Sequence, residues 1–166
     1  LRPLAGKRVD SQLIHWLDVF AVAMLAVSGG LTAARRRLDI FGFAVIGTVT
    51  GVGGGTVRDL LLGINPILWV EDPVYIAVCV GVSAAMFFAA PYVARRERIL
   101  LWADALGLAM FSVLGTQRAL LHDAAPLIAV VMGVITATFG GMLRDVLCAQ
   151  VPLIMRKEIY ATAAVI

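Results

Sequence analysis

The amino-acid sequence predicts an all-α membrane protein built from two inverted repeats of three transmembrane helices. Three observations predict this fold: the composition, the spacing of the apolar runs and an internal repeat. Hydrophobic residues make up 61% of the 166 residues, and the mean hydropathy is +0.93. Charged residues, at 15%, are too few to form the polar shell of a soluble domain. We therefore expect the lipid bilayer to be the main partner of this chain.

Five apolar runs are each close to the length of about 20 residues that a membrane-spanning helix needs. Their apolar pattern is continuous rather than alternating, which predicts helices, because open strand edges are not tolerated in lipid. A sixth run begins near Ile159, so we expect that helix to continue, and a seventh to follow, beyond Ile166. The five complete runs cover residues 13–34, 40–62, 74–94, 99–120 and 126–148.

The connections between the runs predict how the chain is oriented. Basic residues gather after the first, third and fifth runs, whereas residues 63–73 carry Glu71 and Asp72 but no Lys or Arg. Cytoplasmic loops of membrane proteins are rich in Lys and Arg. We therefore expect a multi-pass protein of the cell inner membrane, with these clusters in the cytoplasm and the N-terminus on the outer side. Short basic clusters between apolar runs are topology signals, so no nucleic-acid partner is expected. The clustered residues are Arg35, Arg36, Arg37, Arg95, Arg96, Arg98, Arg156 and Lys157.

An internal repeat is the strongest signal in the sequence. The two halves align without a gap at an offset of 86 residues, as from Trp16 to Trp102. Each copy holds three helices, an odd number, so the second copy must enter the membrane from the opposite side. We expect the first repeat to cover about residues 11–94 and the second about residues 97–166. Other matched pairs are Asp18 and Asp104, Gly54 and Gly140, Arg58 and Arg144, Asp59 and Asp145, and Pro66 and Pro152.

Glycines mark the second and fifth runs, at residues 40–62 and 126–148. Gly47, Gly51 and Gly55 recur every fourth residue, which predicts close packing of one helix face. Other glycines lie off that face, so we predict that the helix is kinked or unwound there as well as closely packed. The backbone carbonyls freed by such a turn would line a water-filled path. The glycines of the predicted kinks are Gly53, Gly54, Gly55, Gly140 and Gly141.

Charged side chains at membrane depth are candidates for function. Neighbouring residues on a regular helix point about 100° apart, so we do not expect Arg58 to pair well with Asp59. Asp59 and Asp145 are then the freer carboxylates, able to attract a cation. The alternative is that all the charges form structural ion pairs between broken helices. The ion pairs predicted from similar depth and from the repeat are Asp18 with Arg58 and Asp104 with Arg144.

Hydroxyl side chains can line a polar path, although Ser and Thr also bond the backbone of their own helix, which is the role expected for most of them. His15 and His122 are isolated and lack the spacing of metal ligands. No pairing of a nucleophile with a base is visible, so we expect neither an enzyme nor a bound metal or cofactor. The hydroxyls predicted to line a path are Ser28, Thr50, Thr56 and Thr136.

The glycine motifs, each followed by Arg-Asp, resemble those of the TRIC family of trimeric intracellular cation channels. The segments Gly51–Asp59 and Gly140–Asp145 carry this resemblance, which is closest to the prokaryotic members and covers nearly the whole chain. It implies seven helices and a homotrimer with one path per protomer, between the kinked second and fifth spans. It also implies potassium as the main permeant ion, with sodium as the other candidate. Phe139 stands where the first copy has Gly53, so the second motif departs from the first.

A secondary transporter remains the alternative function, because an inverted repeat is equally a transporter architecture. Its substrate would be a small solute such as glycine. Arg58 and Asp59 together offer a positive and a negative group for the two charges of an amino acid. The resemblance favours the channel, and the physical chemistry of the residues leaves both functions open.

Overall fold

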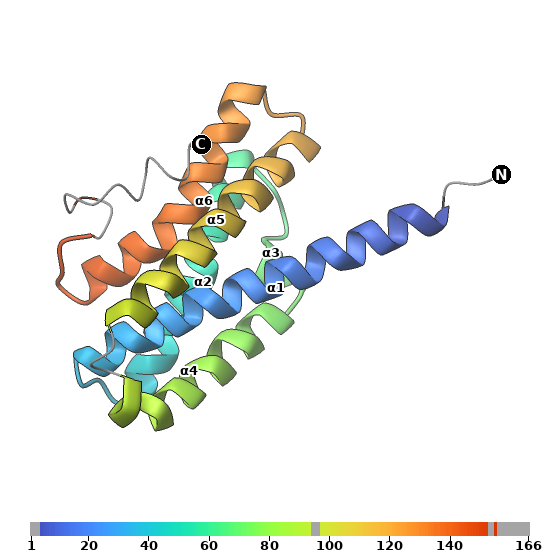
Figure 1. Ribbon diagram of the computed structural model, residues 1–166. Helices are drawn as coiled ribbons and strands as arrows, with labels where there is room; N and C mark the ends of the chain where they lie inside the picture. The colour runs from blue at the N-terminus through green and yellow to red at the C-terminus, as the bar shows by residue number, and fades with distance from the viewer. Residues whose placement is uncertain (1–3, 94–96, 153–154, 156–166) are drawn as a thin grey trace.

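The computed structural model describes residues 4–93, 97–152 and 155, and every regular element in these residues is a helix. The order along the chain is α1 (Leu4–Arg35), α2 (Ile40–Leu62), α3 (Leu68–Glu71), α4 (Val74–Val93), α5 (Glu97–Leu121) and α6 (Pro126–Leu147), as Figure 1 shows. The short α3 lies in the connection between α2 and α4. The other five helices form a bundle.

Five helices of the described residues are long and apolar enough to cross a membrane. Each end lies within two residues of the run expected from hydropathy, so the prediction of five spans is confirmed. The run expected from Ile159, and any seventh helix, lie outside the described residues. The spans are Gln12–Arg35, Ile40–Leu62, Val74–Tyr92, Arg98–Leu121 and Pro126–Leu147.

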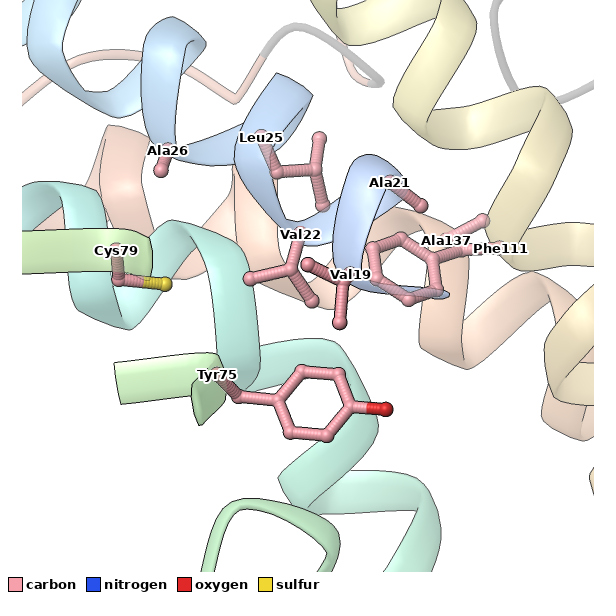
Figure 2. Packing of buried hydrophobic residues seen from close by; sticks show 9 residues of the cluster. All are labelled: Val19, Ala21, Val22, Leu25, Ala26, Tyr75, Cys79, Phe111 and Ala137. Atoms are coloured by element: carbon pink, nitrogen blue, oxygen red, sulfur yellow. The ribbon is translucent and has the colours of Figure 1, made fainter. Parts of the chain in front are cut away.

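The span of α1 is the central element of the bundle. It is 67% buried inside the protein, whereas the span of α4 is only 17% buried and faces outward. α1 packs against α2, α4 and α5, and α6 packs against both α2 and α5. Figure 2 shows the core around it, where Val22 and Leu25 of α1 lie near Tyr75 of α4 and Phe111 of α5.

The ends of α2 follow from its sequence. Asp39 precedes the helix, and its carboxylate accepts a hydrogen bond of 2.8 Å from the backbone N–H of Gly42. This is the usual capping of free N–H groups in a first turn. Gly63 follows the helix with a φ of 67°, a left-handed conformation that favours glycine. The 23-residue length of α2 is therefore set locally at both ends.

The glycine-rich segments of α2 and α6 stay α-helical throughout. The expectation of an unwound turn at Gly53–Gly55 or Gly140–Gly141 is therefore wrong for these helices. Backbone hydrogen bonds continue there because lipid offers no other partner to a freed carbonyl. A bend without loss of helix at these glycines stays a prediction.

Candidate functional site at the crossing of α2 and α6

α2 and α6 cross through two reciprocal contacts between a glycine and a threonine. A Cβ atom added to Gly54 would overlap the carbonyl oxygen of Thr136, and one added to Gly140 would overlap that of Thr50. The two glycines are partners in the sequence repeat, and so are the two threonines. Only glycine allows backbones to approach this closely. Gly54 and Gly140 thus serve close helix packing, while Gly53 lies over Leu143 of the facing helix.

Further glycine pairs hold each half of the bundle together in the same way. A Cβ added to Gly29 of α1 would lie 2.8 Å from the Cα atom of Gly47 on α2. A Cβ added to Gly115 of α5 would lie 3.1 Å from the Cα atom of Gly133 on α6. These two contacts are again related by the 86-residue offset. The packing of α1 with α2 therefore matches that of α5 with α6.

The four predicted hydroxyls all have hydrogen-bond partners within the protein. Thr50 and Thr136 are buried and each donates to the carbonyl four residues earlier, at 2.6 Å. Thr56 donates to the Val52 carbonyl at 2.8 Å and accepts from the Trp69 indole at 2.9 Å. Ser28 belongs to a charged cluster described below. These contacts are structural in this conformation, and the lining of a path by these residues stays a prediction.

Arg58 and Asp59 form a buried ion pair with each other, which corrects the expectation that neighbours on a helix pair poorly. Arg58 donates from Nε and Nη2 to Oδ1 of Asp59 at 2.8 and 2.7 Å. The long Arg side chain folds back across the angle between the two positions. Asp59, fully buried, also accepts from the backbone N–H of Leu68 at 3.1 Å. Asp59 is therefore not a free carboxylate, and it anchors the start of α3.

Asp18 lies near this pair but does not bind Arg58 directly, because Arg58 is already engaged by Asp59. No ion pair joins Asp18 to Arg58 among the described residues, although their charges interact. The hydroxyl of Tyr75 donates to Oδ2 of Asp18 at 3.3 Å. Arg118 enters the same cluster from α5, with its Nε 3.6 Å from Oδ1 of Asp59. We name Asp18, Arg58, Asp59 and Arg118 the first charge cluster.

A second charge cluster joins Ser28, Asp104, Arg144 and Asp145. The buried Arg144 donates from Nη1 to both carboxylate oxygens of Asp104, at 2.7 and 3.0 Å, which is the contact that the repeat predicted. Its Nε donates to Oδ1 of Asp145 at 2.8 Å. The hydroxyl of Ser28 accepts from Arg144 and donates to Asp104. Asp145 is thus held in a network from α1, α5 and α6 and is not a free carboxylate.

Two glycines border open space beside the buried arginines. A Cβ added to Gly55 would meet only Nη2 of Arg58, and one added to Gly141 only Nη2 of Arg144, each at 3.7 Å. Near Gly55 lies a small space of about 10 Å³, lined by α1, α2, α3, α4 and α5. That volume is close to the minimum for one water molecule. The two motifs thus share one arrangement: the first glycine packs against the facing helix, and the next glycine borders the space beside the arginine.

Sequence reasoning missed the roles of Arg118 and Tyr75. The match of Arg118 in the other repeat is Thr32, so the repeat gives no sign of an ion pair at Arg118. Tyr75 is the second residue of its span and reaches Asp18 across the bundle. Both roles depend on how α4 and α5 are placed against α1.

Comparison with known families places these motifs in context. The family model described as "Glycine transporter" matches residues 15–91 and 101–166. The second match begins 86 residues after the first, which is the offset of the sequence repeat. The inner membrane protein YadS of Escherichia coli K12 is 45% identical over 158 residues, which are 93% of this chain and 75% of that protein. A membrane protein of Vibrio cholerae is 41% identical over 162 residues, but this chain spans only 66% of its length.

Solved structures share the fold as well as the sequence. The TRIC trimeric intracellular cation channel orthologue from Rhodobacter sphaeroides is 52% identical with a TM-score of 0.89, covering 92% of this chain and 79% of that one. A prokaryotic TRIC channel solved in 0.5 M KCl is 32% identical with a TM-score of 0.88, covering 93% of this chain and 80% of that one. At 52% and 32% identity, these proteins are similar to this chain in sequence as well as in fold.

Proposed function

Because this chain belongs to the prokaryotic branch of the trimeric intracellular cation (TRIC) channel family, we propose that it is a channel for monovalent cations, permeable to potassium. The observation that carries the proposal is the agreement in both fold and sequence with the Rhodobacter sphaeroides channel. By the same likeness we propose a homotrimer in which each protomer holds its own ion path.

We place the ion path along α2 and α6. Gly55 and Gly141 border space beside Arg58 and Arg144, and the glycine–threonine crossing lies between these two points along the helices. At the crossing an added methyl group has no room, so an ion has none between the two helices either. Conduction through this point therefore requires α2 and α6 to separate. Separation would expose the carbonyl oxygens of Thr50 and Thr136, which are groups that can replace the water around a potassium ion.

The chain is a multi-pass membrane protein, and we propose that its two repeats have inverted topology. The matched contacts of Gly29 with Gly47 and of Gly115 with Gly133 support two equivalent halves. Their opposite orientation follows from the odd number of helices expected in each half. We further propose an inner-membrane location with the N-terminus outside and the Arg-rich loops in the cytoplasm. Arg36 donates to the carbonyl of Ala149 at 3.2 Å, which supports one membrane side for these two connections.

A secondary transporter of a small solute such as glycine is the second candidate. The observation in its favour is the description of the family model that matches both halves. Arg58 and Asp59 are a poor site for a zwitterion in this conformation, because they are buried and bind each other. A transporter would need a different pair of charges or a large rearrangement.

Flux in proteoliposomes separates the two candidates. The purified protein is reconstituted, and a potassium gradient and then a glycine gradient are imposed in separate assays. Potassium current that rises with concentration, without coupling to another solute, is expected. Saturable glycine uptake without ion current would replace the channel by the transporter. Empty liposomes processed in the same way are the control for leakage.

A further inference from the structure

An open hollow of about 300 Å³ lies beside the first charge cluster, away from the crossing of α2 and α6. It is formed by α1, α3, α4 and α5. Its polar lining includes His15, Asp18, Asp72, Tyr75 and Arg118, with Ile14 and Leu68 as apolar neighbours. The hollow is open to the surroundings of the bundle, and Glu71 in its lining is exposed.

Two side chains of this hollow have hydrogen-bonding groups without a partner. Among the described residues, only three buried side-chain polar atoms lack one: Oδ1 of Asp18, Nε of Arg118 and the hydroxyl oxygen of Ser83. Two of the three belong to this hollow, and Asp18 is only 8% exposed. Leaving a buried charged donor or acceptor unsatisfied is costly, so such groups usually mark a missing partner.

The neighbouring residues do not supply that partner. Oδ1 of Asp59 lies 3.6 Å from Nε of Arg118, but it already accepts two hydrogen bonds from Arg58. Its other oxygen accepts from the backbone N–H of Leu68. On Asp18, Tyr75 satisfies Oδ2 and leaves Oδ1 without a donor. The hollow thus holds one spare anionic acceptor and one spare cationic donor.

We propose that this hollow binds a small free amino acid through both of its charged groups. The α-ammonium group would donate to Oδ1 of Asp18, and the α-carboxylate would accept from Nε of Arg118. A zwitterion satisfies both groups and adds no net charge to a partly buried site. A lone cation would satisfy Asp18 and leave Arg118 without an acceptor. Glu71 and Asp72 also line the hollow and add negative charge to it.

Binding requires a small movement, because both unpartnered atoms are buried in this conformation. The Arg118 side chain is 26% exposed and is the group best able to turn toward the hollow. The volume suits a ligand with a small side chain together with a few water molecules. The inference concerns binding in the hollow and goes beyond the proposed ion path, so it holds whether or not the protein conducts potassium.

Thermal unfolding of the purified full-length protein in lipid nanodiscs tests the proposal, with glycine added at constant KCl. Low millimolar glycine is used, since general solute effects need higher concentrations. A saturable rise of the unfolding midpoint is expected, on the order of 5 °C at a concentration 100-fold above the dissociation constant. Acetate and methylammonium, added alone or together, are expected to give less than a fifth of this shift.

Variants assign the binding to the hollow. Arg118→Gln and Asp18→Asn are expected to abolish the glycine shift. Asp123→Asn is the matched control, because Asp123 is an exposed acid in the connection after α5 and does not line the hollow. Arg118→Gln is the decisive variant if Asp18→Asn does not fold. A glycine shift that persists in Arg118→Gln would overturn the proposal.

The ligand series identifies other occupants, and flux separates the two proposals. An equal shift with methylammonium alone would mean a simple cation site and would overturn the amino-acid proposal. No shift with any ligand would overturn it too. Potassium flux without glycine binding would support the channel and overturn the amino-acid site. Glycine binding without potassium flux would support the amino-acid site and overturn the channel.

Discussion

Replacing Gly54 by alanine is the most direct test of the crossing between α2 and α6. The added carbon would lie 2.9 Å from the carbonyl carbon of Thr136 and closer still to its oxygen. Ordinary contacts of a carbon atom are about 3.5–4.0 Å. The two helices must therefore move apart by roughly 1 Å. The neighbouring atoms are backbone, so no flexible side chain can move away instead.

The expected cost of Gly54→Ala is about 2–3 kcal/mol in the free energy of unfolding, at the upper end of typical overpacking. Gly140→Ala separates the same two helices, since its added carbon would lie 3.2 Å from the carbonyl carbon of Thr50. The second substitution then meets helices that are already apart. The double variant should therefore cost at least about 1 kcal/mol less than the sum of the single variants.

The assay is equilibrium unfolding of the reconstituted protein, with Gly81→Ala as the matched control. Gly81 lies in α4, and an added Cβ meets nothing within 4 Å. Alanine is the better helix former, so this control is expected to be neutral or stabilised by up to about 1 kcal/mol. Equal stability of Gly54→Ala and Gly81→Ala would refute the close crossing. Additive costs in the double variant would refute the shared contact.

Three further predictions concern the second charge cluster, the ion path and the orientation. Asp104→Asn weakens two hydrogen bonds from Arg144, which keeps Asp145 as its ion partner, so it should lower the free energy of unfolding by about 1–3 kcal/mol. The exposed Asp123→Asn should change it by less than about 0.5 kcal/mol in the same titration, and similar costs for both would contradict a buried network. Gly55→Ala places a methyl group in the space beside Arg58. Potassium flux should therefore fall at least about threefold, while the unfolding midpoint stays within about 2 °C of the unsubstituted protein. Unchanged flux would show that this position does not line the ion path. Arg36→Cys and Asp123→Cys, made with the two native cysteines replaced by alanine, should be labelled by a membrane-impermeant maleimide from the cytoplasmic and the outer side respectively, and labelling of both from one side would reject the proposed topology.

The membrane spans were predictable from the sequence because the bilayer imposes a local condition. Each span must be apolar over about 20 residues and must satisfy its own backbone, whatever its neighbours do. Hydropathy alone therefore places the ends of α2 and α6 correctly to within one residue. The repeat also predicts a contact between distant residues, because the pairing expected for Asp18 and Arg58 places Asp104 with Arg144 by analogy.

The individual roles of the glycines needed the tertiary structure. Gly54 and Gly55 are neighbours with the same chemistry, yet one is pressed against Thr136 and the other borders open space. Their difference depends on how α2 is rotated toward α6, and the pattern of one helix does not contain that rotation. The prediction of an unwound turn failed for the same reason, since packing against the facing helix already explains the glycines that lie off the main face.

The sequence predicts five apolar spans, a repeat at an offset of 86 residues and charged residues within the spans. Which of these charges have hydrogen-bond partners depends on the packing of the helices. Arg58 binds Asp59 through a flexible side chain, and Arg118 arrives from a different helix beside Asp18. The difference arises because transfer into lipid depends on each residue along the chain, whereas a hydrogen bond of about 3 Å depends on the relative placement of whole helices.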